Sequence, residues 1–444
     1  MIAQTFSGYW WRTGEPSDRQ PGTLTIASDG AAILQLIGGF DVRQYTSLPG
    51  GATSIDEGPS RIAVVHGETT AAKNITLLDC VIQRYSMGFT TPTQQQISAR
   101  FTLVGIHLDD ADTEVFESCH LRVENLRTWA TLGKRKFTQE ENGRERTATV
   151  SAQEPISARF ENFTITLDMC AGPFNYSATK DGADVTSRTT ATLSITSDVP
   201  RSHRGFQEIT MGIVDLLTLA SNRACGVISQ QLVCRPEPEE IPDLVEGKLG
   251  GRTVMYKPFA DLFARRIVTA TPDDREIDFQ EFLFTCRDIP FEDLVVRWLT
   301  LRKEVVRATN MVFSLHYSKP TFVQTQVLVA AVSAEALSRC LHPPARKKTY
   351  KERLLDIAAT PPQAIVGKII PDVEAWANEL KSVRNGLAHG LEDQGQNANL
   401  FLLLQRTKYL IYLVLMGEIG LSEAILDRAV EANQYLMYLY REQP

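Results

Sequence analysis

An arginine, an asparagine and a histidine lie close together in the stretch KSVRNGLAHG, residues 381–390, as Arg384, Asn385 and His389. Arginine stays charged and can hold a phosphate through two hydrogen bonds. Histidine titrates near neutral pH and can act as a general base or a general acid. Cleavage of RNA without a metal needs a base for the 2′-hydroxyl, an acid for the leaving 5′-oxygen, and positive charge beside the phosphate. These three residue types suit that reaction.

The spacing of the three residues limits how one site could use them. In a helix, Asn385 and His389 are about 40° apart and share a face, whereas Arg384 and His389 are about 140° apart. Either Arg384 bends across, or the site forms in a groove between two copies of the helix, which predicts a symmetric dimer. An Arg-x4-His spacing also occurs by chance and a helix histidine usually has a structural role, so an ordinary helix is the alternative.

The C-terminal part of the chain must position these residues, and its pattern is helical from Phe291 onward. Apolar residues recur at helical spacing, and prolines separate the segments. The pattern predicts a compact bundle of about five helices in residues 321–444. The expected helices cover roughly Thr321–Leu341, Tyr350–Ala358, Pro371–His389, Asn397–Gly417 and Ser422–Leu439.

The first half of the chain is β-rich. Thr23–Ile26 and Ile33–Ile37 alternate polar and apolar residues on either side of the turn Ser28–Gly30, which predicts a hairpin. Similar short runs follow, separated by Gly, Pro, Asn and Asp. Many short strands with turns between them favour a sandwich or a barrel-like sheet in residues 1–235.

The pattern changes between these two parts. Phe206–Ala220 has helical spacing, and Arg235–Pro242 is rich in proline and glutamate, which is typical of a linker and excludes a helix or a central strand. Residues 236–320 are therefore expected to be a linker and helical connecting region. The predicted fold class is α+β multidomain, with a β-rich N-terminal domain followed by an all-α helical bundle.

Charge is unevenly distributed along the chain. The formal net charge is −7, which argues against a protein that coats nucleic acid. Residues 321–444 contain thirteen Lys and Arg and thirteen Asp and Glu, so residues 1–320 carry the whole −7 and favour protein recognition. The helical part has one basic cluster, which is either a solvated loop or a phosphate-steering patch. This basic cluster comprises Arg346, Lys347, Lys348 and Lys351.

Other candidate sites are weaker. Two groups of carboxylates are expected to be solvated loops rather than cation sites; they are Asp109, Asp110 and Asp112, and Asp273, Asp274 and Glu276. The sequence before Gly247-Lys248 has Pro242 where a phosphate-binding loop needs glycine, so no such loop is expected. The aromatic run Phe6, Tyr9, Trp10 and Trp11 is expected to anchor the first strand in the core rather than to stack on bases.

The seven cysteines are widely spaced and include no CxxC, so we expect reduced, mostly buried thiols and no metal or cofactor. The N-terminus lacks a signal-peptide pattern. The most apolar run, Tyr409–Met416, is too short to span a bilayer. A soluble, cytoplasmic protein without a membrane contact is expected.

Two parts of the sequence resemble known families. RNGLAH resembles the Arg-x(4–6)-His motif of the HEPN superfamily, which are helical-bundle domains that often act as metal-independent ribonucleases. Val327–Leu341, with Glu335, resembles the first HEPN helix and its acidic residue, and Tyr350–Leu354 resembles the second helical element. FSGYWW, PGTLTIASDG and ILQLIGGF, within residues 6–40, resemble the N-terminal domain of the ApeA family of bacterial anti-phage proteins, which place it before a C-terminal HEPN nuclease.

The resemblance implies an abortive-infection effector, in which a homodimeric or larger HEPN assembly stays inactive until a phage protein triggers cleavage of host RNA, with tRNA as an expected substrate. The products would carry 2′,3′-cyclic phosphate and 5′-hydroxyl ends. Arg384 would stabilise the scissile phosphate, His389 would be the general base or acid, and Asn385 would orient the phosphate or the histidine. Glu335 would order the cleft through hydrogen bonds to Arg384. The alternatives are a non-catalytic HEPN scaffold that binds a partner protein or RNA, and an enzyme sited in the β-rich domain, where no nucleophile or ligand set supports it.

Overall fold

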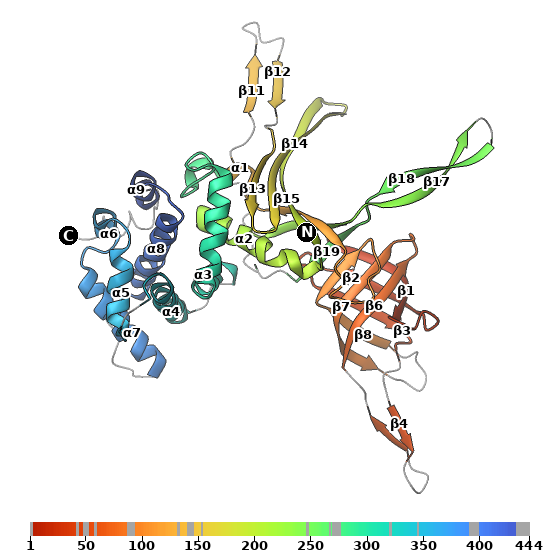
Figure 1. Ribbon diagram of the computed structural model, residues 1–444, viewed down its shortest axis with the longest axis horizontal. Helices are drawn as coiled ribbons and strands as arrows, with labels where there is room; N and C mark the ends of the chain where they lie inside the picture. The colour runs from red at the N-terminus through yellow and green to blue at the C-terminus, as the bar shows by residue number, and fades with distance from the viewer. Residues whose placement is uncertain are drawn as a thin grey trace.

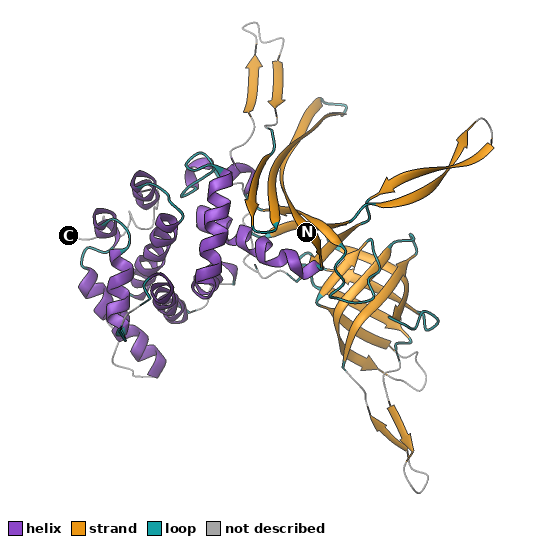
Figure 2. Ribbon diagram, viewed as in Figure 1, coloured by secondary structure: helices purple, strands orange, loops and turns teal. Residues whose placement is uncertain are grey.

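The computed structural model describes residues 3–40, 44–47, 53–56, 60–86, 94–130, 134–139, 146–151, 154–245, 248–265, 268, 277–318, 322–343, 346–389 and 399–431. Its strands gather at one end of the molecule and its helices at the other (Figures 1 and 2). This arrangement confirms the predicted fold class, a β-rich N-terminal part followed by a helical bundle.

Six strands close a barrel at the N-terminal end. They are β1 (Gln4–Arg12), β2 (Gln20–Ile26), β3 (Ala32–Ile37), β6 (Arg61–Thr69), β7 (Asn74–Ser86) and β8 (Gln94–Ala99). Neighbours pair antiparallel in the order β7-β6-β1-β2-β3-β8, and β8 pairs back onto β7. The predicted hairpin is confirmed as β2–β3, with Ile26 opposite Ala32. Alternate residues of β2 and β3, such as Leu24 and Leu34, face the interior and are fully buried.

The aromatic run lies on β1. Trp10 fills the barrel interior and is fully buried, which confirms its role as a core anchor; Trp11, on the opposite face of the strand, is also buried, at 6% exposure. Tyr9 is 54% exposed, so for this residue the expectation was wrong. Trp11 makes edge-on contacts with the rings of His66 and His107 outside the barrel core.

Strand β7 belongs to two sheets. Residues Ile75–Leu78 pair with β9 (Phe101–Val104), whereas residues Val81–Ser86 pair with β8 of the barrel. Asp79 lies between the two halves with a left-handed φ of 53°, which bends the strand at the point where its partner changes.

The second sheet continues from β9 in the order β9-β19-β16-β10-β15-β14-β13, so thirteen of the described strands form one sheet with the barrel. The added strands are β10 (Phe116–Val123), β13 (Ile156–Phe160), β14 (Phe163–Ala178), β15 (Ala183–Arg201), β16 (Val227–Cys234) and β19 (Phe259–Ala264). The short helix α1 (Leu126–Ala130), the 3-10 turn η1 (His203–Phe206) and helix α2 (Gln207–Ser221) join the same buried core.

The structure corrects the expected linker. Glu237–Val245 is strand β17, which pairs with β18 (Lys248–Tyr256) in a ribbon that projects from the body (Figure 1). Prolines are tolerated there because an isolated ribbon, unlike a central strand, leaves one edge of β17 without a partner. The same region also supplies β19, which lies in the middle of the large sheet. Two further ribbons project: β4 (Gln44–Ser47) with β5 (Thr53–Asp56), and β11 (Lys134–Gln139) with β12 (Arg146–Ser151).

The helical part begins with α3 (Phe291–Tyr317), which lies between the sheet and the other helices (Figure 1). The following helices are α4 (Val323–Leu341), α5 (Tyr350–Ala359), α6 (Gln363–Ile369), α7 (Val373–His389), α8 (Leu400–Glu418) and α9 (Glu423–Glu431). They confirm the expected helices to within a few residues, except that α6 was not predicted and residues 432–439 lie outside the described part. In the described part of the chain, α8 is the one helix that is long and apolar enough to cross a membrane. Its most apolar 18-residue stretch is 61% buried inside the bundle.

One hydrophobic core runs from the second sheet through α2 and α3 into the bundle. Polar contacts reinforce it. The Trp298 indole of α3 donates to the Gly212 carbonyl of α2 at 2.7 Å, and Arg302 Nε donates to Asp215 Oδ2 at 2.6 Å. Asn222, at the end of α2, donates to the Tyr409 hydroxyl of α8 at 2.5 Å. The β-rich part and the bundle are therefore packed on each other.

Candidate active site

Helix α7 carries the motif found in the sequence. Its apolar face, which includes Trp376, Leu380 and Val383, is buried against the bundle. The Trp376 indole donates to Thr407 Oγ1 of α8 at 3.2 Å. These contacts hold the helix in a fixed rotation, so its last two turns present Arg384 and Asn385 at half-buried positions.

Two neighbours hold the Arg384 side chain. Its Nη1 donates to Asn385 Oδ1 at 3.1 Å, and its guanidinium carbon lies 5.1 Å from the centre of the Tyr350 ring. Among the described residues, no carboxylate forms an ion pair with Arg384. Because Arg384 is half-buried and its charge has no carboxylate partner in that set, it is suited to bind an anion such as a phosphate.

Tyr350 is the first residue of α5 and lies between helices α4 and α7. Its hydroxyl donates to the Ala331 carbonyl of α4 at 3.2 Å. Burial raises the pKa of Tyr350, the Glu335 carboxylate raises it further, and the Arg384 guanidinium lowers it. The phenol is therefore neutral at physiological pH and lies within electrostatic reach of both charged residues.

Glu335 and Arg384 do not make the direct hydrogen bond that we expected from the sequence. Glu335, whose side chain is 13% exposed, accepts a hydrogen bond from Arg339 at 2.6 Å, one turn along the same helix. An i,i+4 partner is always within reach on a helix, so Arg339 satisfies this carboxylate locally. Among the described contacts, Tyr350 is the residue that interacts with both Glu335 and Arg384.

His389 is the last residue of α7, and its side chain lies outside what the structure describes. Helix α7 is continuous from Arg384 to His389, so the expected angle of about 140° between these two residues applies. That the two side chains meet in one cleft, within one chain or across a dimer, stays a prediction.

The basic cluster is largely compensated by carboxylates. Three of its members form ion pairs: Arg346 with Glu352 at 2.6 Å, Lys348 with Asp356 at 2.6 Å, and Lys351 with Glu374 at 2.5 Å. Lys347 is exposed. Surface ion pairs of this kind, some of them half-buried, still leave donors for phosphate, but the net positive field is smaller than the sequence suggested. A role in RNA binding stays a prediction.

The acidic clusters do not form a metal site in the described residues, where no group of three potential ligands converges. Asp112 instead accepts a hydrogen bond from Arg204 at 3.3 Å. The second cluster, residues 273–276, lies outside the described part of the chain.

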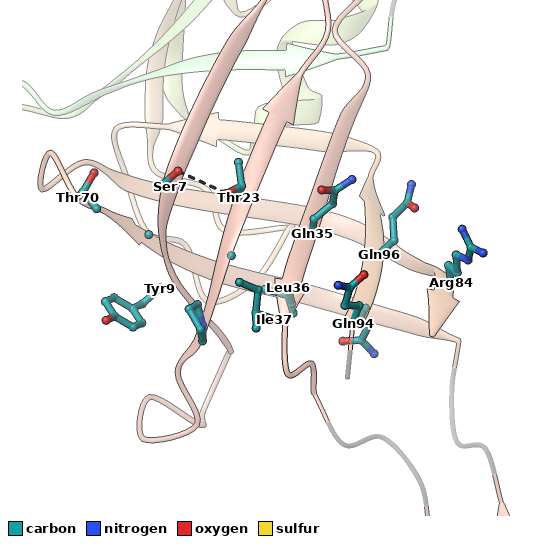
Figure 3. Close-up of a pocket in the computed structure, with 14 residues that line it drawn as sticks. Ser7, Tyr9, Thr23, Gln35, Leu36, Ile37, Thr70, Arg84, Gln94 and Gln96 are labelled. Carbon is teal, nitrogen blue, oxygen red and sulfur yellow. Dashed lines mark hydrogen bonds between the residues drawn. The ribbon is translucent and has the colours of Figure 1, made fainter. Parts of the chain in front are cut away.

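A hollow of about 670 Å³ lies on the outer wall of the barrel (Figure 3). Its lining comes mainly from β1, β2, β3, β7 and β8 and is mainly hydroxyl and amide side chains, such as Ser7, Gln35 and Gln94. Arg84 is the one charged residue among the described residues of the lining. Those described residues include no pair of acid and base groups, so the hollow fits a binding surface better than an active site.

The fold and the Arg384 site define a class of protein: a β-barrel and sheet domain joined to a helical bundle with an Arg-x4-His helix. Residues 5–298 match the family described as ApeA N-terminal domain 1, and residues 334–425 match the family described as Apea-like HEPN. The chain belongs to the ApeA family and is an ApeA-like protein with a C-terminal HEPN domain. Comparisons with curated proteins and with solved structures give no significant match.

This membership supports an anti-phage HEPN effector, and HEPN domains are generally ribonucleases that bind RNA and oligomerise. The first match extends past residue 235 and includes β17, β18 and β19, the strands that complete the sheet. Sequence reasoning missed the contact of Tyr350 with Arg384. The available signal was an aromatic residue at the first position of the second HEPN-like element.

Proposed function

We propose that this protein is a metal-independent endoribonuclease of the abortive-infection type. The observation that carries the proposal is the environment of Arg384. Asn385 and the Tyr350 ring hold this arginine, no described carboxylate pairs with it, and His389 ends the same helix. A preorganised cation without a carboxylate partner among the described residues is suited to the charge that develops on a phosphate during cleavage.

In the proposed reaction, Arg384 binds the scissile phosphate and Asn385 keeps the guanidinium oriented. His389 removes the proton from the 2′-hydroxyl, whose oxygen attacks the adjacent phosphorus and expels the 5′-oxygen of the next nucleotide. A second histidine, supplied by the partner of a symmetric dimer, protonates that leaving oxygen. The products are a 2′,3′-cyclic phosphate and a 5′-hydroxyl, and the proposed substrate is host tRNA.

The proposed trigger is a phage protein that binds the β-rich part. Two observations support it. Residues 1–320 carry the whole net charge of −7, which disfavours RNA as their ligand. The core is continuous from the sheet through α3 into the bundle, so a change in the first part has a packed route to the second.

The test is a cleavage assay on purified wild type, Arg384→Ala and His389→Ala, with total RNA and with tRNA in excess EDTA. Arg428→Ala is the matched control, because it removes a half-exposed arginine of the same bundle that pairs with Asp288 away from the motif. Circular dichroism checks that each variant is folded. We expect cleavage by the wild type and the control only, with cyclic phosphate ends.

The trigger is tested by adding lysate of phage-infected cells to the same reactions. If the wild type cleaves neither total RNA nor tRNA, whether or not this lysate is added, the nuclease proposal is wrong. The protein is then better described as a non-catalytic scaffold. Equal cleavage by wild type and Arg384→Ala would also contradict the assigned site.

A further inference from the structure

Tyr350 has contacts with two helices of the site, and the proposed reaction does not use it. Its hydroxyl is bonded to the main chain of α4 through Ala331, and its ring face lies under the Arg384 guanidinium of α7. Its own position is fixed by the start of α5. There, Thr349 and Glu352 form a reciprocal pair of hydrogen bonds that caps the helix. Tyr350 is therefore an anchored aromatic ring rather than a mobile surface side chain.

A guanidinium is planar and carries five N–H donors around its edge. In this site, the guanidinium carbon lies over the Tyr350 ring, 5.1 Å from its centre, and Asn385 takes a donor at Nη1. A cation–π contact attracts the charge of the guanidinium as a whole and needs no hydrogen-bond acceptor. The other donors therefore remain for a phosphate, in an orientation fixed before the substrate binds.

We propose that Tyr350 is the positioning residue for Arg384, holding its guanidinium in place so that the remaining donors meet the scissile phosphate. This proposal rests on the proposed nuclease function. The phenol itself takes no part in proton transfer, because it stays neutral and its proton is bonded to the Ala331 carbonyl. The ring carries the effect, and its replacement should lower the rate without removing the reaction.

The test compares Tyr350→Phe, which keeps the ring, with Tyr350→Leu, which removes it. Leu354→Ala is the matched control, since Leu354 is a fully buried residue of the same helix and its loss weakens packing without changing the ring. We expect Tyr350→Phe to keep the wild-type kcat and Tyr350→Leu to lose roughly five- to thirtyfold, the factor that a cation–π contact can supply. The loss should fall mainly on kcat, because charge on the phosphate builds in the transition state. Leu354→Ala should melt at a lower temperature and keep its kcat below that temperature.

Two results would overturn the proposal: a Tyr350→Leu enzyme as fast as wild type, or a Tyr350→Phe enzyme as slow as Tyr350→Leu. A wild type that cleaves no RNA would instead refute the proposed function. The contact between the Tyr350 ring and the Arg384 guanidinium is then tested by NMR. In that measurement, the ring current of Tyr350 should shift the Arg384 guanidinium signals upfield in wild type and Tyr350→Phe but not in Tyr350→Leu, with Arg384→Lys used for assignment. Unshifted signals in wild type would overturn the positioning role.

Discussion

Replacement of Asp215 by alanine should loosen the contact between the β-rich part and the helices. Asp215, on α2, is 1% exposed and accepts hydrogen bonds from Arg302 Nε and from the Tyr317 hydroxyl, both on α3. Arg302 is itself only 6% exposed. In Asp215→Ala, the guanidinium would therefore keep its burial and lose its counter-ion.

The expected cost follows from that burial. Removal of one partner from a buried ion pair costs about 3–5 kcal/mol, because an uncompensated charge remains. Loss of the hydrogen bond from Tyr317 adds about 1 kcal/mol. Domains are usually stable by only about 5–15 kcal/mol, so the contact between α2 and α3 should open far more often.

Hydrogen exchange followed by mass spectrometry measures this opening locally, which suits a chain too large for a single two-state transition. Peptides that cover α2 and α3 should exchange roughly a hundred to several thousand times faster in Asp215→Ala, the factor that corresponds to about 3–5 kcal/mol. Glu281→Gln is the control, because it alters the exposed ion pair with Arg223 and should change exchange by less than about tenfold.

A double variant separates the buried charge from the loss of packing. Asp215→Leu with Arg302→Met removes both charges and keeps apolar volume, so it should be much more stable than Asp215→Ala. Slow exchange in Asp215→Ala, or a double variant as labile as the single one, would refute the reasoning.

Three further predictions concern stability. Burial, followed by the charge of Arg204, lowers the pKa of His203 to about 4. Between pH 6.5 and 4 the unfolded chain therefore binds one more proton than the folded chain. The free energy of unfolding should fall by about 3 kcal/mol as the pH drops through that window. In His203→Phe, the melting temperature measured over the same pH range should fall less than in wild type. Gly67→Ala would place a Cβ 2.2 Å from the Trp10 ring and should destabilise the barrel by about 1–3 kcal/mol, whereas Gly182→Ala has open space and should melt as wild type does. Thr349→Ala removes the cap of α5 and should cost about 1 kcal/mol in thermal unfolding, with recovery in Thr349→Ser.

The bundle could be predicted largely from local sequence. Apolar spacing and flanking prolines placed α4, α5 and α7 within a few residues. Helix α6 was missed because QAIVGKI has only two turns, too few for a helical period to stand out. Local pattern also predicted β2 and β3, whose interior faces alternate cleanly.

Features that depend on distant partners could not be predicted. FADLFA is β19 because β9 and β16, which lie far away in the sequence, accept it on either side. Within the site, Arg384 and Asn385 followed from the motif. The Tyr350 contact is tertiary, and the wrong partner was expected for Glu335 because Arg339 competes one turn away. The sequence therefore gives the chemistry of the motif, whereas the packing of α4, α5 and α7 decides which groups touch it.

The position of β19 also sets the order in which the protein can fold on the ribosome. The barrel strands β1–β3 and β6–β8 all lie within residues 4–99 and can close early, while the rest of the chain is still being made. The second sheet cannot join the barrel through β9 until β19 has emerged, because β19 is the strand hydrogen-bonded to both β9 and β16. Helix α7 is translated still later. During synthesis, the segment that carries Arg384 and His389 therefore emerges only after every strand of the N-terminal sheet is available to pair, so the proposed nuclease can form directly against a completed N-terminal domain.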